Sequence, residues 1–310
     1  MLIALIVVLS LAVLFFLTLY VVYYIVFRSP QKGQNDFYAL PAGEQYQKVK
    51  DRMYGLVDKL LAKEYEEVFI TSYDGLKLYG RYYHYQDGAP LDIGFHGYRS
   101  TSIRDMSGGG SISTSLKHNL LIVDQRAHGK SEGKTITFGI KERYDCVAWI
   151  NYAINRFGED TQIRIAGVSM GATTVLLASG LNLPKNVFCI VADCPFSSPE
   201  KIIKKVVKDM KLPPTLLYPL IELSAKIFGG FSLGEVTVPD AIKSSKIPTI
   251  IIHGDDDRFV PKEMSDEILA VRPDFEHKFF KDSGHGLSYL DYPEEYTEVI
   301  LDFVKRHKKS

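Results

Sequence analysis

The sequence predicts an α/β fold: a mostly parallel, doubly wound sheet with an inserted helical cap, preceded by an N-terminal transmembrane helix. From residue 91 onward, short apolar runs alternate with helical stretches, which is typical of a parallel sheet covered on both faces. Residues 1–27 contain no charged side chain. The 310 residues, 46% of them hydrophobic, suffice for one main domain with a sizeable core.

The first 27 residues predict a membrane anchor. As a helix they would reach roughly 40 Å, longer than the ~30 Å hydrocarbon core of a bilayer. A cleaved signal peptide is the alternative, but it needs a basic leading region and a small-residue cleavage site, and neither is evident. Arg28 and Lys32 follow the span and no basic residue precedes it, which favours a cytoplasmic catalytic domain. The expected aromatic belt at the end of the span is Tyr20, Tyr23, Tyr24 and Phe27.

The soluble part divides into residues 28–62, a linker and an amphipathic helix, and a main domain over residues 63–310. The helix is expected over 41–63, because apolar residues recur there at helical spacing. Runs 67–71 and 76–85 flank an Asp74-Gly75 turn and predict a hairpin. Further strands are expected at 91–95, 120–123, 163–166, 187–192, 247–252 and 275–280, and helices at 141–156, 170–180, 262–271 and 293–307.

The interval from Cys194 to Thr249 is too long for a simple crossover and predicts a helical cap at about 197–236. Its apolar residues have two interpretations: they pack the cap against itself, or they line a pocket for an apolar substrate. The segment 201–208 places four lysines beside apolar pairs, so it could also rest on an anionic membrane surface. The apolar residues are Leu212, Leu216, Leu217, Leu220, Ile221, Leu223, Ile227, Phe228 and Phe231.

Composition excludes several classes of function. Basic and acidic residues number 37 each, so no overall field draws the chain to nucleic acid. The three cysteines lack metal-ligand spacing and are expected to be buried free thiols. We expect no metal at His96, His128 and His253, because no two have helix-face spacing.

Two glycine motifs resemble phosphate-binding loops only superficially. Gly129-Lys130-Ser131 lacks the glycine five residues upstream, where Asp124 stands, so no cradle of backbone amides is expected. The cluster at 108–110 is not followed by a Gly-Lys-Ser/Thr motif and is expected in a loop or at a helix start.

Gly167-Val168-Ser169-Met170-Gly171 carries the main chemical signal. It follows an expected strand and precedes an expected helix, the context in which a G-x-S-x-G turn presents an exposed, nucleophilic serine. A side chain at either glycine would crowd the turn. Ser169 is therefore the predicted nucleophile.

A serine nucleophile needs a base to take its proton and an acid to orient that base. His285 follows the last expected strand among small residues and is the predicted base. Asp255, Asp256 and Asp257 end another strand, at the sheet edge where ligands collect, and one of them is the predicted acid.

With these motifs, residues 65–307 resemble the α/β-hydrolase superfamily, among its cap-bearing serine esterase, lipase and acyl-hydrolase members. The resemblance of 253–261 to the family's H-G-x-x-D-x-x-V-P pattern selects Asp257 as the acid. The resemblance of His96-Gly97-Tyr98 to the H-G-x segment implies an oxyanion hole made by the backbone N–H groups of Tyr98 and Met170. The turn 124–131 resembles a family motif that braces the neighbouring loop.

The resemblance implies a carboxylesterase or lipase-like enzyme that needs no cofactor or metal. A small-molecule or lipid-like ester is the expected substrate, and the N-terminal helix is the expected contact with the membrane. The same triad would also serve a thioesterase or a peptidase. A non-catalytic, membrane-tethered binding protein on this fold is the alternative from another class.

Overall fold

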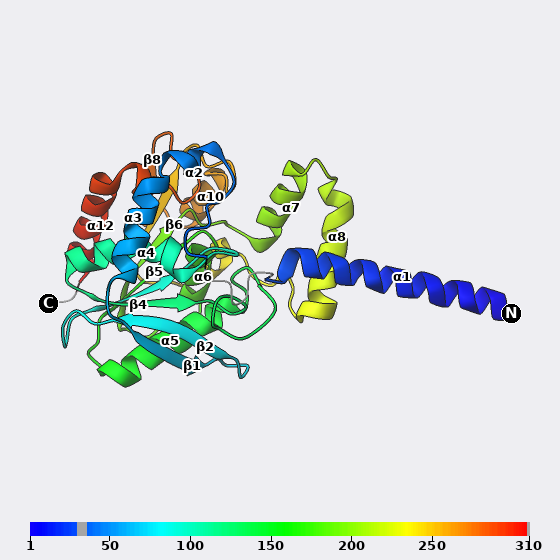
Figure 1. The fold of residues 1–310 in the computed structure, drawn as a ribbon, viewed down its shortest axis with the longest axis horizontal. Helices are drawn as coiled ribbons and strands as arrows, with labels where there is room; N and C mark the ends of the chain where they lie inside the picture. Colours follow the sequence, from blue (N-terminus) through cyan, green and yellow to red (C-terminus); the bar gives the residue numbers. More distant parts are fainter. Residues whose placement is uncertain (30–35, 309–310) are drawn as a thin grey trace.

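In the computed structural model, which describes residues 1–29 and 36–308, the main domain is built on an eight-stranded sheet (Figure 1). The strand order is β1-β2-β4-β3-β5-β6-β7-β8. Strand β2 is antiparallel to both β1 and β4, and all other neighbours are parallel. The strands are β1 Glu66–Thr71, β2 Lys77–Tyr83, β3 Leu91–Phe95, β4 Asn119–Asp124, β5 Ile163–Val168, β6 Val187–Asp193, β7 Thr249–Gly254 and β8 Glu276–Phe280.

Helices cover both faces of this sheet, as predicted. Helices α5 and α6 pack on one face over the largest apolar cluster, while α3, α4 and α12 cover the other. The central strands are buried on both faces, which explains their continuous apolar runs. The helices of the domain are α2 Glu44–Lys48, α3 Lys50–Leu61, α4 Ser102–Leu116, α5 Glu142–Phe157, α6 Met170–Ser179, α7 Pro199–Asp209, α8 Pro214–Ser224, α9 Val238–Ile242, α10 Glu263–Val271, α11 Ser288–Asp291 and α12 Pro293–His307.

The cap lies between β6 and β7 and consists of α7, α8 and a π-helical turn, η1, at Ala225–Gly229. In Figure 1 it stands on the side of the sheet from which the N-terminal helix projects. Helix α7 buries Ile202, Ile203 and Val207; among its lysines, Lys201 and Lys208 are exposed, and Lys204 and Lys205 are half-buried.

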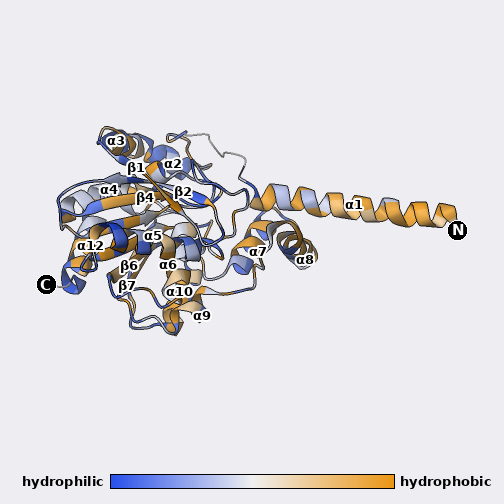
Figure 2. Ribbon diagram, turned by 90° about the horizontal axis from the view of Figure 1, so that it is seen from below, coloured by the Kyte–Doolittle hydropathy of each residue, from blue (hydrophilic) through white to orange (hydrophobic). Residues whose placement is uncertain are grey.

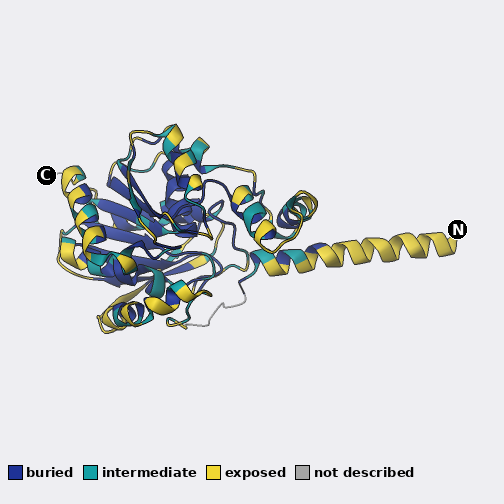
Figure 3. Ribbon diagram, turned by 90° about the horizontal axis from the view of Figure 1, so that it is seen from above, coloured by how far each residue is buried: buried dark blue, intermediate teal, exposed yellow. Residues whose placement is uncertain are grey.

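Helix α1, Leu2–Phe27, is apolar over its whole length and long enough to cross a bilayer. Figure 2 shows that α1 is coloured hydrophobic over most of its length, with paler turns toward the domain, and Figure 3 shows that most of the helix is exposed. Leu19, Tyr23 and Phe27 alone are buried, at the end that meets the domain. Lys32 and the other residues from 30 to 35, which belong to the predicted linker, lie outside the described residues.

Two expectations need correction. The helix expected over 41–63 is two helices, α2 and α3, which meet at Val49. The glycines at 108–110 lie inside α4 and not in a loop or at a helix start. A Cβ on Gly108 would lie 2.6 Å from the ring of Tyr289, and one on Gly110 would lie 3.2 Å from Leu60. Close packing of α4 against its neighbours thus outweighs the low helix propensity of glycine.

Candidate active site

The turn between β5 and α6 holds Ser169 in a strained conformation, with φ 55° and ψ −117°. A Cβ on Gly167 would lie 2.2 Å from the backbone of Gly171, and one on Gly171 would lie 2.0 Å from the carbonyl oxygen of Phe95. Only glycine fits at either position. The serine therefore stands where the chain turns sharply from strand into helix, at the carboxyl edge of the sheet.

The side chains of Ser169, His285 and Asp257 form one line of hydrogen bonds. The Oγ of Ser169 lies 2.9 Å from the Nε2 of His285, and the Nδ1 of His285 lies 2.7 Å from the Oδ2 of Asp257. Asp257 follows β7 and His285 follows β8, so three strand ends converge on one point. The structure thus brings together all three residues that the sequence predicts for the triad.

Asp257 is held as a carboxylate. Burial alone would raise its pKa, but the charge of His285 and hydrogen bonds from His253 and His285 outweigh burial and hold the pKa well below its usual range. Its Oδ1 also accepts the N–H groups of Phe259 and Val260 at 2.9 and 2.8 Å. Because Asp257 is ionised, Nδ1 of His285 is the nitrogen that carries hydrogen, which leaves Nε2 to accept the proton of Ser169.

The loop after β3 places a free backbone N–H beside the serine. The N–H of Gly97 donates to Asp105 at 2.8 Å, and the N–H of Arg99 donates to Nε2 of His128 at 3.0 Å. Within residues 1–29 and 36–308, the N–H groups of Tyr98 and Met170 have no hydrogen-bond partner. A Cβ on Gly97 would lie 3.4 Å from that of Ser169, so the loop touches the predicted nucleophile. These are the two amides that the sequence predicts for the oxyanion hole.

The turn at 124–131 braces this loop, as the sequence predicts. Asp124 accepts hydrogen bonds from Ser102 and from the N–H of Lys130. Arg126 is buried between Asp74 and Asp145, which fixes the backbone on which His128 stands. Burial, together with the neighbouring His96, lowers the pKa of His128 to about 3, so this histidine remains a neutral acceptor for the Arg99 N–H.

Two contacts around the triad were missed from the sequence. His253 accepts a hydrogen bond from Ser265 through Nδ1, so its Nε2–H is shared between Asp257 at 3.1 Å and the carbonyl of Val260 at 2.8 Å. Tyr46 of α2 donates to the backbone carbonyl of His285 at 3.0 Å. The H-G-x-x-D spacing could have indicated the first contact. Nothing in the sequence links residue 46 to residue 285.

A cavity of about 660 Å³ reaches Ser169 and His285 and runs beneath α4. No residue of the cap between 199 and 231 is part of its described lining. Some of the apolar cap residues, Ile221, Phe228 and Phe231 among them, pack within the cap and against α1, whereas Leu212, Leu216 and Ile227 are exposed. The cavity therefore does not support the interpretation in which the cap lines a substrate pocket. Apolar side chains that line the cavity include Leu40, Met53, Leu56, Met106, Ile112 and Phe259.

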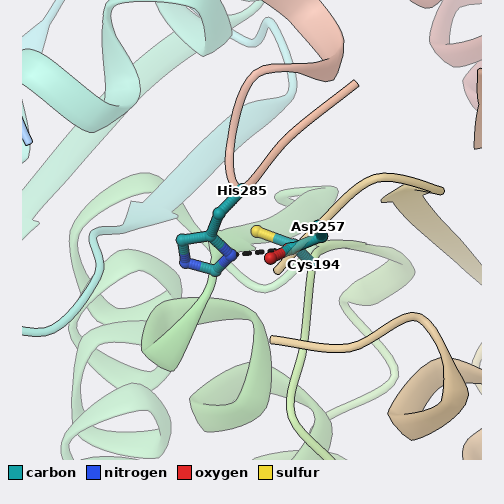
Figure 4. A group of neighbouring side chains, drawn as sticks. All are labelled: Cys194, Asp257 and His285. Atoms are coloured by element: carbon teal, nitrogen blue, oxygen red, sulfur yellow. Dashed lines mark hydrogen bonds and ion pairs between the residues drawn. The ribbon is translucent and has the colours of Figure 1, made fainter. Parts of the chain in front are cut away.

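Cys194 lies beside the triad (Figure 4). One possible ligand atom each from Cys194, Asp257 and His285 lies within 4.8 Å of the others, a geometry that could hold a metal ion. Burial raises the pKa of the Cys194 thiol well above its usual value, and a protonated thiol is a poor metal ligand. Asp257 and His285 already bond each other. The cluster therefore fits a triad with a buried thiol better than a metal centre. All three cysteines are buried and free, as predicted.

The α/β-hydrolase family model matches residues 111–239. A solved structure of the esterase Pf2001 from Pyrococcus furiosus superposes with a TM-score of 0.67 at 29% identity, covering 81% of this chain and 94% of that one. The chain has the α/β-hydrolase fold.

Curated relatives match over shorter stretches. The chain is 29% identical to the Bacillus subtilis protein YqkD over 191 residues, 61% of this chain and 63% of that protein. It is 26% identical to a 2-hydroxy-6-oxononadienedioate/2-hydroxy-6-oxononatrienedioate hydrolase from Pseudomonas over 158 residues, 46% of this chain. The matches thus span less than two thirds of either relative, 63% and 54% of their lengths.

Proposed function

We propose that this hydrolase is a serine esterase of the carboxylesterase or lipase-like type that works at a membrane. The observation that carries the proposal is the line of hydrogen bonds from Ser169 through His285 to Asp257, at 2.9 and 2.7 Å. Beside it lie two backbone N–H groups that have no partner in the part of the chain that the structure describes. Similarity to the Pyrococcus furiosus esterase favours an ester over the other acyl compounds that this chemistry could cleave.

The reaction follows from the geometry. Ser169 Oγ attacks the ester carbonyl carbon while Nε2 of His285 takes the hydroxyl proton. Asp257 stabilises the resulting imidazolium, and the N–H groups of Tyr98 and Met170 bind the carbonyl oxygen as it becomes negative. His285 then gives the proton to the departing alcohol, which leaves the acyl group on Ser169. A water molecule, deprotonated by the same histidine, releases the acid and restores the serine.

The membrane part of the proposal rests on α1. Its length and composition suit a single-pass anchor, and Arg28 directly after it favours a cytoplasmic catalytic domain. A leader sequence would share the length and composition, but here Leu19, Tyr23 and Phe27 are built into the apolar packing of the domain. We therefore propose that α1 is retained and that the cavity accepts a small or lipid-like ester.

Full-length protein in detergent, assayed with p-nitrophenyl esters and with acyl thioesters of matched chain length, tests the proposal. We expect higher kcat/KM for the esters, and loss of hydrolysis in Ser169→Ala. Preference for thioesters, or cleavage of peptides, would reassign the substrate to the alternatives that the same triad can serve. Absence of hydrolysis of every class by folded protein would favour the non-catalytic binding protein.

A further inference from the structure

Helix α1 divides into a free part and a docked part. Residues 1–18 are all exposed, whereas Leu19, Tyr23 and Phe27 are buried against the domain. The free helical residues 2–18 rise about 26 Å at ~1.5 Å per residue, close to the ~30 Å hydrocarbon core of a bilayer. If α1 spans a bilayer, the membrane surface must therefore meet the protein at the level where α1 meets the cap.

Helix α8 and η1 of the cap lie beside α1 at the level where the membrane surface would meet the protein. Phe228 of η1 packs edge-on against Tyr20 with ring centroids 5.4 Å apart, and it lies 5.8 Å from Tyr23. The groove beside this contact is lined by α1 residues as far back as Leu9. Figures 1 and 2 agree that α8 lies beside α1 where this helix leaves the domain. Helix α8 and η1 thus face the plane that a bilayer around the free part of α1 would occupy.

The same part of the cap exposes large apolar side chains. Leu216 on α8 is 66% exposed and Ile227 on η1 is 45% exposed, and Met210 and Leu212 are exposed between α7 and α8. Together these four residues are called the cap ridge. Of the four lysines in 201–208, Lys201, Lys204 and Lys205 form ion pairs with acidic groups of the protein. A partner that binds this surface would therefore be held mainly by apolar contacts and less by the charge of the lysines.

We propose that the cap ridge is a bilayer-docking surface, which sits among lipid headgroups and upper acyl chains beside α1. The occupant is a lipid bilayer, because α1 already commits the adjacent surface to that environment. The cavity lies nearby: Tyr98, which lines it, donates its hydroxyl to the carbonyl of Val26 in the last turn of α1 at 2.7 Å. The substrate class that fits is an amphiphilic ester drawn from the bilayer. This assignment of the substrate rests on the proposed esterase function, whereas the docking of the cap ridge does not.

Depth-dependent fluorescence quenching tests the docking directly. A polarity-sensitive probe on Leu216→Cys or Ile227→Cys, in full-length protein in vesicles, should be quenched by lipids that carry a nitroxide near the headgroup. The control is Leu61→Cys, 36% exposed at the end of α3, a helix that lies away from the cap in Figure 1. Equal quenching at all three positions, or none at 216 and 227, would overturn the proposal whether or not the protein is an esterase.

A second arm tests the substrate class. Leu216→Asp in the full chain should lower kcat/KM severalfold for a long-chain ester presented in vesicles, while hydrolysis of soluble p-nitrophenyl acetate stays unchanged. Equal rates on the vesicle ester for variant and wild type would refute delivery from the bilayer. Wild-type protein that hydrolyses neither ester would contradict the esterase function, with the quenching result still deciding the docking.

A separate set of contacts joins α1 to the oxyanion loop, residues 97–99. Nη2 of Arg99 donates to the carbonyl oxygens of Ile25 at 2.6 Å and Arg28 at 2.8 Å, and Tyr98 donates to that of Val26. The last carbonyls of a helix lack partners within it and favour a cation. The ring of Tyr98 also stacks on Phe138, whose ring meets that of Phe27.

We infer that the side chains of Arg99 and Tyr98 are positioning residues, through which α1 holds the oxyanion loop from outside while Asp105 and His128 hold it from inside. This inference rests on the proposed function. The backbone N–H of Tyr98 must point at the carbonyl oxygen of the substrate ester. If the loop were held on one side only, this N–H group could move away from that oxygen.

Arg99→Met and Tyr98→Phe in the full chain test this role. With rates normalised to titrated active sites, we expect kcat to fall about tenfold in Arg99→Met, with partial rescue by Arg99→Lys and little change in KM. Tyr23→Phe is the matched control, since it removes a bond from α1 to Thr135 and leaves the loop contacts intact. An unchanged kcat in Arg99→Met, or an equal loss in Tyr23→Phe, would contradict the role. Failure of active-site titration in wild type would instead contradict the proposed function.

Discussion

At the scale of single residues, Ser169 and His285 are expected to act as one unit. Each of Ser169→Ala and His285→Ala should lower kcat by roughly 10⁴ to 10⁶, because either change removes the activated nucleophile. The double variant should be little worse than either single variant. Steady-state kinetics on one ester, with circular dichroism to confirm folding, measure this. Losses that multiply in the double variant would mean that the two residues do not cooperate.

The residue scale also marks what sequence could and could not reveal of the site. Ser169, His285 and Asp257 could be located because each follows an apolar strand within a short motif. The contacts of Tyr46 with His285, and of Arg99 with the end of α1, could not. They join segments tens to hundreds of residues apart through bonds to backbone oxygens, which leave no pattern in the sequence.

At the scale of elements, periodicity predicted all eight strands and most of the long helices. It did not predict the short helices α9 and α11, nor the long helix α4. Its Gly108-Gly109-Gly110 run has poor helix propensity, and only contact with Tyr289 and Leu60 explains why it is helical. The apolar residues of α8 show the same limit, because the sequence could not distinguish a pocket lining from a face beside α1. Tertiary packing decided both, and local sequence does not encode which neighbour will be present.

The glycines of α4 provide a matched pair of substitutions. A Cβ on Gly109 meets nothing within 4 Å, so Gly109→Ala should stabilise the protein by about 0.5–1 kcal/mol through helix propensity. Gly108→Ala should destabilise it by about 1–3 kcal/mol, because its Cβ would lie 2.6 Å from the Tyr289 ring. Thermal unfolding in detergent compares them. Equal effects of the two substitutions would contradict the packing described for α4.

At the scale of the whole molecule, buried titratable groups set the response to pH. The pKa of His128 is about 3 in the folded protein, chiefly because of burial, against an ordinary 6.5. The unfolded chain therefore binds the extra proton first, and the stability due to neutral His128 is complete above about pH 6.5 and lost progressively toward pH 3. Asp145 and Asp193 act in the opposite direction, because burial raises the pKa of each to about 6.

His128→Gln separates these contributions. Glutamine can still accept the Arg99 N–H but does not titrate, so the variant should lose less stability than wild type between pH 6.5 and pH 4. The melting temperature in detergent, recorded across this range, gives the two slopes. Parallel curves for variant and wild type would show that His128 does not control the acid response.

The central claim, that Ser169 is an activated nucleophile, is tested most directly by mass spectrometry of full-length protein treated with a fluorophosphonate. The probe should add once, on the peptide that contains Ser169, and its addition should slow by orders of magnitude in His285→Ala. Folded wild-type protein that stays unlabelled, or a label on another residue, would contradict the account.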